Sequence, residues 1–356
     1  MKKIVALFLA VAMVATLAAC GAKPESQAPS SETPAPSSST AEEAKFSIAM
    51  VTDVGGVNDQ SFNQSAWEGI QKAADWGAEG KYLESKQEAD YISNLDKMTD
   101  EGHNIVWGVG FMMGDAVLDA AKKNPDQQYA IIDNAYENTP ANLTGVLFKV
   151  EEPSFVAGYL AAASTKTGKV GFIGGIKSAA IDAFEYGYRA GVAYANKELK
   201  KTVTVDVQYA DSFGDAAKGK AIANSQYAAG CDIIFHAAGN VGQGLFESAK
   251  ENNKFAIGVD RDQSDLAPQN IITSVMKLVG QGIYNVSKDL KDGKAIGGQT
   301  VTLDTKSGAC GIAPNKGLVD ETVYKNSLAV QDKIVAGEIT PPATEDAFKA
   351  YTDSLK

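Results

Sequence analysis

The stretch Phe46-Ser47-Ile48-Ala49-Met50-Val51, which runs into Thr52-Asp53-Val54-Gly55-Gly56, sets a pattern that the rest of the chain repeats. The mostly apolar run predicts a buried strand, and the glycines end that strand before an amphipathic segment at residues 61–74. Strands that are apolar throughout, each followed by a helix, are typical of parallel sheets with helices on both faces.

The same alternation predicts an α/β fold over the whole body of the chain. We expect strands at residues 46–51, 105–109, 129–133, 145–150, 170–174, 203–209, 233–237, 256–260, 271–275 and 300–303. We expect helices at residues 61–74, 90–101, 114–123, 153–165, 181–197, 216–229, 242–250, 279–290 and 321–335. These strands are too many for one sheet of ordinary size, so we predict two lobes.

Polar residues follow several of the predicted strands. Asp53, Asp133 and Asp260 each stand at or just after a strand end, and glycines accompany them at other strand ends. Ligands of such sheets bind beyond the carboxyl ends of the strands. Each aspartate could simply cap the next helix, but three of them beside glycines and aromatic residues favour a shared polar pocket.

The first residues predict the destination of the chain. Lys2 and Lys3 precede an apolar run at residues 4–16, which is too short to span a bilayer and is typical of a secretory signal. Leu17-Ala18-Ala19-Cys20-Gly21 resembles a bacterial lipobox. We therefore predict a signal peptide at residues 1–19 and a lipid on Cys20, the alternative being an ordinary signal with a chance cysteine.

Residues 20–44 combine this cysteine with a segment rich in Ser, Pro, Ala and Glu. Such a composition cannot bury enough apolar surface to fold, so we expect a disordered tether to the membrane. Globular sequence begins at Lys45 and leaves about 310 residues, enough for two domains.

The composition excludes several classes of partner and site. The net charge of −11 argues against nucleic acid as a partner. His103 and His236 have no Cys or carboxylate spaced to form a metal site with them. Cys231 and Cys310 either pair or are two buried small side chains. We expect no metal and no cofactor.

Enzyme motifs are incomplete. Residues 214–221 spell most of a phosphate-binding loop, but Ala221 stands where a Ser or Thr is needed to hold magnesium. A nucleoside hydrolase would cluster aspartates around calcium near the first strand, whereas only Asp53 and Asp59 are close together here. We therefore expect a binding protein and not an enzyme.

The motif Asp53-Val54-Gly55-Gly56-Val57-Asn58-Asp59-Gln60-Ser61-Phe62-Asn63 resembles the opening signature of the basic membrane lipoprotein family. Further similar blocks stand at residues 155–161, 171–175, 184–188, 212–215, 218–219, 239–242, 258–260 and 273–277, so that the resemblance covers residues 45–356. Members of this family are substrate-binding proteins of ABC transporters, and the best-understood ones bind purine nucleosides.

The resemblance implies a type I periplasmic-binding-protein fold, with two Rossmann-like lobes joined by three crossover strands around a ligand cleft. It places one lobe at residues 45–150 and 277–303, and the other at 151–276 and 304–356. The ligand-binding residues that it implies are Asp53, Asn58, Phe62, Asp133, Phe213, Gly242, Asp260 and Lys277, with Gly239 as an alternative to Gly242.

These residue types suit a purine nucleoside such as adenosine, guanosine or inosine. Phe62 and Phe213, one from each lobe, could stack on the two faces of the base. Asp53 and Asp260 could accept hydrogen bonds from the ribose hydroxyls, and Lys277 would offset the negative charge. Asp133 and Asn58 would address the edge of the base.

The implied partners are the permease subunits of an ABC transporter and the membrane, through the lipid on Cys20. We expect a monomer on the extracytoplasmic face of the cell membrane. Two alternatives keep the fold: a sugar or signalling furanose as the ligand, or a sensor that presents its bound form to a membrane receptor.

Overall fold

The computed structural model describes residues 45–356. The predicted signal peptide at 1–19, the lipidated Cys20 and the tether at 20–44 lie outside the described residues. Between Lys45 and Lys356, every helix is too short or too polar to cross a membrane.

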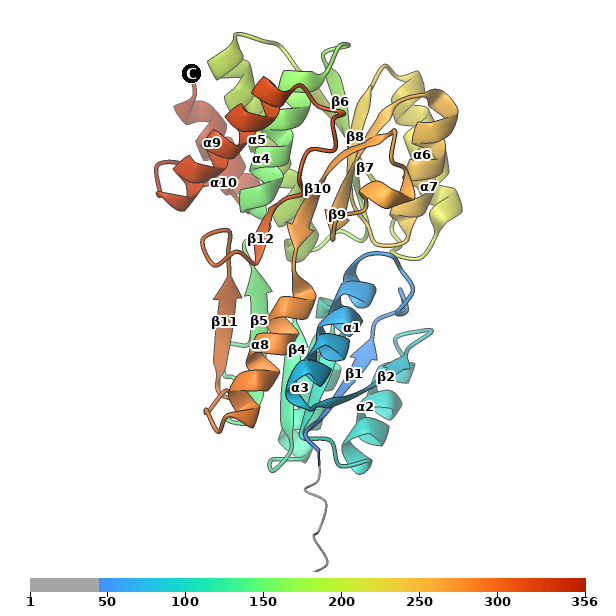
Figure 1. Cartoon of the computed structure of the whole chain (residues 1–356), viewed down its shortest axis with the longest axis vertical. Coiled ribbons are helices and arrows are strands. Elements are labelled where there is room, and N and C mark those ends of the chain that lie inside the picture. The colour runs from blue at the N-terminus through green and yellow to red at the C-terminus, as the bar shows by residue number, and fades with distance from the viewer. Residues whose placement is uncertain (1–44) are drawn as a thin grey trace, which may run out of the picture. The chain divides into compact units, whose positions relative to one another are not determined.

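Two six-stranded sheets form the frame of this body (Figure 1). The first has the order β11-β5-β4-β3-β1-β2, and the second has the order β12-β10-β9-β8-β6-β7. Neighbouring strands are parallel except for the antiparallel pair β10 and β12. The strands are β1 Ser47–Thr52, β2 Glu79–Glu84, β3 Ile105–Val109, β4 Gln128–Ile132, β5 Leu143–Phe148, β6 Lys169–Gly174, β7 Thr204–Tyr209, β8 Ile233–Ala237, β9 Phe255–Asp260, β10 Ile271–Lys277, β11 Gln299–Leu303 and β12 Cys310–Ile312.

Helices cover both faces of each sheet. We call the first sheet with α1, α2, α3 and α8 lobe 1, and the second sheet with the other helices lobe 2 (Figure 1). The helices are α1 Phe62–Lys72, α2 Asp90–Asp100, α3 Gly114–Lys123, α4 Glu151–Ser164, α5 Ala179–Leu199, α6 Ala216–Ala228, α7 Val241–Asn252, α8 Val279–Lys291, α9 Glu321–Val335 and α10 Glu345–Ser354. Short 3-10 turns occupy Ala73–Trp76, Phe111–Met113 and Ser264–Leu266.

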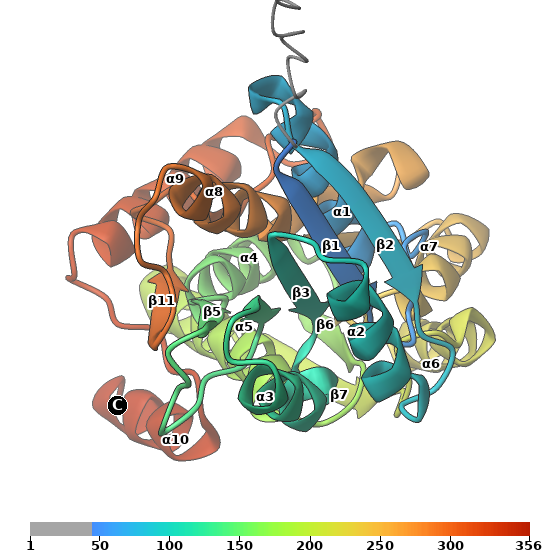
Figure 2. The ribbon, with the colours of Figure 1, turned by 90° about the horizontal axis from the view of Figure 1, so that it is seen from below.

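The first strand shows why the sheet is buried on both faces. Ile48 and Met50 pack into the core beneath α1 and α8, whereas Ala49 and Val51 pack into the core beneath α2 and α3. The two helix pairs lie on opposite sides of the lobe 1 sheet when it is seen from below (Figure 2). The alternation of side chains along a strand therefore fills both layers, as the apolar runs predicted.

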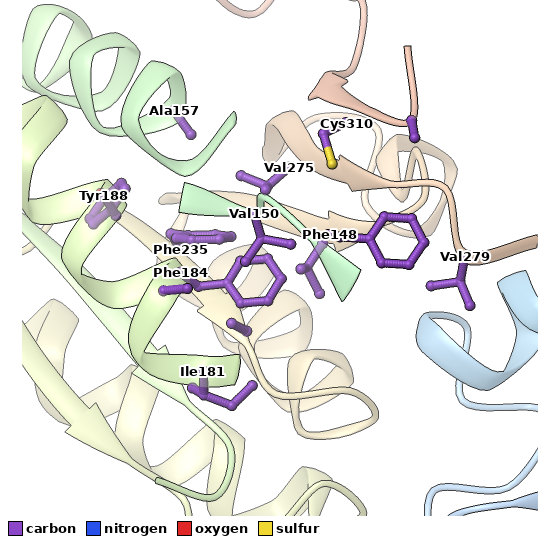
Figure 3. Packing of buried hydrophobic residues seen from close by; sticks show 14 of the residues in the cluster. Phe148, Val150, Ala157, Ile181, Phe184, Tyr188, Phe235, Val275, Val279 and Cys310 are labelled. Atoms are coloured by element: carbon purple, nitrogen blue, oxygen red, sulfur yellow. The ribbon is translucent and has the colours of Figure 1, made fainter. Parts of the chain in front are cut away.

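The chain passes between the two sheets three times within residues 45–356, after β5, after β10 and after β11. One hydrophobic cluster contains residues beside all three passages: Phe148 and Val150, Val275 and Val279, and Cys310. Figure 3 shows these side chains gathered between the lobes. The apolar core thus continues along the three passages between the sheets. The predicted α/β fold with two lobes is confirmed.

Three elements escaped the sequence-based prediction. Strand β2 is a largely exposed edge strand of sequence EGKYLE, and β12 has only three residues, so neither gives a clear apolar run. Helix α10 has only ten residues and none of them is buried, although Phe348 and Tyr351 pack against the core. The strand expected at 145–150 runs from Leu143 to Phe148, and it ends at Phe148 because Lys149 and Val150 already belong to the passage into α4.

Candidate ligand-binding site

A cleft lies between the two lobes, at the carboxyl ends of β1, β3, β4, β8 and β9. It holds about 560 Å³ of atom-free space, counted out to the solvent at its mouth. The lining residues are Asp53, Gly55, Asp59, Phe62, Asn63, Gly110, Phe111, Asp133, Ala180, Ile181, Phe184, Phe213, Gly239, Val259, Asp260 and Lys277.

Asp53 is held at the end of β1 by the loop that follows it. Its Oδ1 accepts hydrogen bonds from the backbone N–H of Gly55 at 2.9 Å and from Asn63 Nδ2 at 2.8 Å. Its Oδ2 lies against Gly110, where a Cβ would stand 3.0 Å away, and Gly110 has a φ of 120° that suits only glycine. Burial raises the pKa of Asp53 to about 6, although the two donors act in the opposite direction.

Asp133 and Lys277 form an ion pair between the end of β4 in lobe 1 and the end of β10 in lobe 2. The Lys277 side chain is 4% exposed and that of Asp133 is 11% exposed. The ammonium also lies 4.8 Å from the ring centre of Phe62 and 5.8 Å from that of Phe184. Lys277 is therefore a buried cation enclosed by a carboxylate and aromatic faces.

Asp260 ends β9 on the opposite side of the cleft from β1. Its Oδ2 accepts a hydrogen bond from Ser61 Oγ of lobe 1 at 2.5 Å. Burial raises the pKa of Asp260 to about 7, and the charge of Lys277 opposes that shift. The cleft is lined by four aspartates and one lysine, so a phosphate would face mostly carboxyl groups and is a poor ligand.

Asp133 and Asp260 occupy equivalent places in the two sheets, since β4 and β9 hold the same position in the two strand orders. Both have a φ of 66°, a left-handed conformation that is uncommon for a residue with a side chain. Strained backbone of this kind tends to gather at functional sites. The shared conformation therefore supports a role for both aspartates in the cleft.

Four phenylalanine rings line the cleft in two groups. Phe62 and Phe184 share the ammonium of Lys277. Phe111 and Phe213 meet edge to face, with ring centres 6.3 Å apart. Phe62 and Phe111 belong to lobe 1, and Phe184 and Phe213 belong to lobe 2, so each lobe offers two aromatic surfaces to a bound molecule.

Asp59 and Asn63 also line the cleft, although neither was expected there from the sequence. Asp59 accepts hydrogen bonds from the backbone N–H groups of Ser61 and Asn63, and so fixes the start of α1. Asn63 is 1% exposed, and its Oδ1 is buried without a hydrogen-bond partner among residues 45–356. The motif contained both residues, but only the fold shows that Asn63 turns toward the cleft.

Two of the predicted site residues do not line the cleft. Asn58 is exposed, and Asp59 and Asn63 of the same motif take the inner positions. Gly242 lies in the first turn of α7 against His236, where a Cβ would stand 2.1 Å from the imidazole ring. Gly239 lines the cleft in its place, because the turn before α7 carries it to the end of β8. The other six residues meet in the cleft.

Candidate metal ligands do not gather in this part of the molecule. Within residues 45–356, no group of three or more His, Cys, Asp or Glu side chains is arranged to hold a metal ion. Cys231 and Cys310 are buried free thiols in separate hydrophobic clusters, which answers the open question of their pairing.

Comparison with known proteins agrees with this architecture. A crystal structure of an ABC transporter solute-binding protein from Aeropyrum pernix K1 superposes with a TM-score of 0.78 at 27% identity, and covers 87% of this chain and 97% of that one. Basic membrane protein A of Borreliella burgdorferi is 38% identical over 309 residues, which are 85% of this chain and 90% of that protein.

A second relative is named for its ligand class. The ABC transporter nucleoside-binding protein BmpA of Lactococcus lactis subsp. cremoris is 36% identical over 369 residues, which cover 96% of this chain and 99% of that protein. The model of the Bmp family, described as ABC transporter substrate-binding protein PnrA-like, matches residues 46–345. The chain therefore belongs to the Bmp family of PnrA-like ABC transporter substrate-binding proteins.

Proposed function

We propose that this protein captures a purine nucleoside in the cleft between its lobes and delivers it to an ABC permease for import. The observation that carries the proposal is the lining of one cleft by four phenylalanines and three buried aspartates. A flat base needs aromatic faces, and a ribose needs acceptors for its hydroxyl groups. The name of the Lactococcus relative points to the same class of ligand.

The aromatic groups suit the base. Phe62 from lobe 1 and Phe213 from lobe 2 reach the cleft from opposite lobes, so a ring between them would be stacked only when the cleft is closed. Stacking of a base on an aromatic side chain contributes roughly 1–3 kcal/mol. The buried Oδ1 of Asn63 is an acceptor for an N–H on the edge of the base.

The aspartates suit the ribose. The hydrogen bonds that hold Asp53 go to Oδ1, and the one that holds Asp260 goes to Oδ2, so each carboxylate keeps a second oxygen for a ligand hydroxyl. Two carboxylates that each offer one free oxygen can accept from the two adjacent hydroxyls of a ribose, which favours a ribose over a 2′-deoxyribose. Asp133 and Lys277, whose ion pair joins the two lobes, complete the polar lining of the cleft.

Calorimetric titration tests the proposal directly. We expect adenosine, guanosine or inosine to bind the purified protein, and the corresponding 2′-deoxynucleosides to bind at least about tenfold more weakly. Free sugars and nucleotides serve as controls and should not compete. If ribose alone binds as tightly as a nucleoside, the ligand is a sugar and the base-stacking interpretation is wrong.

The same incubation tests whether the protein only binds. We expect no free base to accumulate when the protein is left with guanosine or inosine, as judged by chromatography. Continued release of base that an Asp53 substitution abolishes would place the protein among the hydrolases.

We further propose that a lipid on Cys20 holds the protein on the extracytoplasmic face of the membrane, as the Leu17-Ala18-Ala19-Cys20 motif indicates. We expect the Cys20→Ala protein to appear in the medium or to remain unprocessed, because it has no thiol to acylate. Fractionation and mass measurement of the mature N-terminus distinguish these outcomes. A Cys20→Ala protein that is processed normally and stays with the membrane would contradict the anchor.

A further inference from the structure

The loop that follows β9 reaches across the cleft to the segment that begins α1. Gln263 Nε2 donates a hydrogen bond to the backbone oxygen of Gln60 at 2.9 Å, beside the Ser61–Asp260 hydrogen bond. Arg261 Nη2 also lies 3.0 Å from Glu68 Oε1. We call this set of contacts the clasp; it consists of Gln60, Ser61 and Glu68 in lobe 1 and Asp260, Arg261 and Gln263 in lobe 2.

Gln263 differs from Arg261 and Asp260, which are the other two lobe 2 residues of the clasp. The Arg261–Glu68 pair is 30% and 44% exposed, and such surface ion pairs contribute little. Asp260 belongs to the wall of the cleft itself. Gln263 is 1% exposed and is not among the residues that line the cleft, so it joins the lobes from behind the wall.

Two donors fix the orientation of the Gln263 amide. Its Oε1 accepts from the backbone N–H of Val259 at 2.8 Å and from His236 Nε2 at 3.1 Å. His236 is fully buried, and burial lowers its pKa to about 4, so the ring is neutral at neutral pH and carries its single proton on Nε2. Because the amide oxygen faces both donors, the amide nitrogen must face lobe 1.

The acceptor on lobe 1 is fixed as well. Gln60 has a left-handed φ of 57°. Asp59 holds the turn around it, because Asp59 Oδ1 accepts from the backbone N–H groups of Ser61 and Gln64. Donor and acceptor are therefore both set before the lobes meet, and forming this hydrogen bond on closure orders little additional chain.

We propose that Gln263 is a positioning residue that couples closure of the cleft to retention of the ligand. It acts through the backbone carbonyl of Gln60, which lies two residues before Phe62. The hydrogen bond therefore fixes the position of Phe62, on the lobe 1 side of the cleft, relative to lobe 2. This proposal rests on the proposed nucleoside function only in one respect, which is the choice of a nucleoside as the ligand in its test.

The decisive variant is Gln263→Glu. The glutamate keeps an oxygen for Val259 and His236, but it replaces the N–H that faces Gln60 with an oxygen. We expect dissociation of the tightest-binding nucleoside, among adenosine, guanosine and inosine, to become about tenfold faster or more. The association rate should change less than about threefold, because the cleft wall is intact. Stopped-flow measurements separate the two rates.

Gln226→Glu is the matched control. Gln226 is also fully buried, and its Nε2 donates to the backbone oxygens of Phe172 and Asp206 at 3.1 and 3.0 Å, all within lobe 2. This variant should lower the melting temperature of the ligand-free protein but leave the dissociation rate unchanged. If Gln263→Glu also lowers only the melting temperature, Gln263 is a packing residue and the proposal is wrong.

The ligand-free protein gives a second arm that does not depend on nucleosides. We expect small-angle scattering to show a larger radius of gyration for Gln263→Glu than for Gln226→Glu, because loss of the clasp favours the open form. Failure of every nucleoside to bind the unmodified protein would overturn the proposed function alone. Equal radii for the two variants would overturn the role of Gln263.

Discussion

Replacing Lys277 with methionine should lower the free energy of unfolding of the ligand-free protein by about 3–5 kcal/mol at pH 8, because it leaves a buried carboxylate without its partner. The Lys277 side chain is 4% exposed and pairs with Asp133. Its charge also opposes the rise in the pKa of Asp260. Methionine keeps the length of the side chain, so the loss reports the charge. Urea denaturation followed by tryptophan fluorescence measures it.

Three further measurements identify the cause. Lys277→Met combined with Asp133→Asn should recover most of the loss, since it also removes the charge of the carboxylate with which Lys277 pairs. Burial raises the pKa of Asp260 to about 7 and the charge of Lys277 opposes that rise, so the single variant should regain stability as the pH falls from 8 toward 5, where the Asp260 carboxyl group takes up a proton in the folded protein. Lys294→Met removes the exposed ion pair with Asp289 and should change little. A small loss for Lys277→Met, or no recovery in the double variant, would contradict this account.

Replacing Phe62 with alanine should weaken nucleoside binding by roughly 1–3 kcal/mol, which is about five- to more than a hundredfold in affinity. Phe62→Tyr and Phe62→Trp should cost less, because each keeps an aromatic face. Calorimetric titration of the three variants with guanosine and inosine measures the difference. Asp260→Ala should have a different effect: it should weaken the binding of ribonucleosides but largely spare the binding of the 2′-deoxy forms.

The competing interpretation is that Phe62 only packs against the core, where its ring also faces the Lys277 ammonium. Phe172→Ala supplies the comparison, because Phe172 is fully buried in lobe 2 and does not line the cleft. It should lower the melting temperature yet leave the affinity of the folded protein unchanged. If Phe62→Ala behaves in the same way, the stacking of a base on Phe62 is excluded.

The strand ends were the part of the site that the sequence could predict. Asp53, Asp133 and Asp260 follow apolar runs, and the carboxyl ends of parallel strands meet at one edge of a sheet. The order of the strands could not be predicted from the local pattern, because the pairing of β11 with β5 joins residues far apart in the chain. The family resemblance implied only that residues 277–303 belong with lobe 1, and it gave no order for the strands.

The sequence pattern could not predict which residues act through tertiary contacts. Gly242 and Gly239 differ by less than one helical turn, and only the contact of Gly242 with His236 shows which of them faces away from the cleft. Gln263 follows β9 with no local signal of its own. Its partners Gln60 and His236 are brought to it by different elements of the fold.

The late position of β11 in the chain has a consequence for biogenesis. Gln299 of β11 pairs with Thr144 of β5, a separation of 155 residues (299 minus 144), so the lobe 1 sheet stays incomplete until most of the protein has been synthesised. Strand β12 completes the other sheet only a few residues later, at Cys310–Ile312. Contacts of such long range slow folding, because the intervening chain must first be ordered. A nascent chain that folds late stays longer in the unfolded form that a secretion channel can thread, which suits the export implied by the signal predicted at residues 1–19.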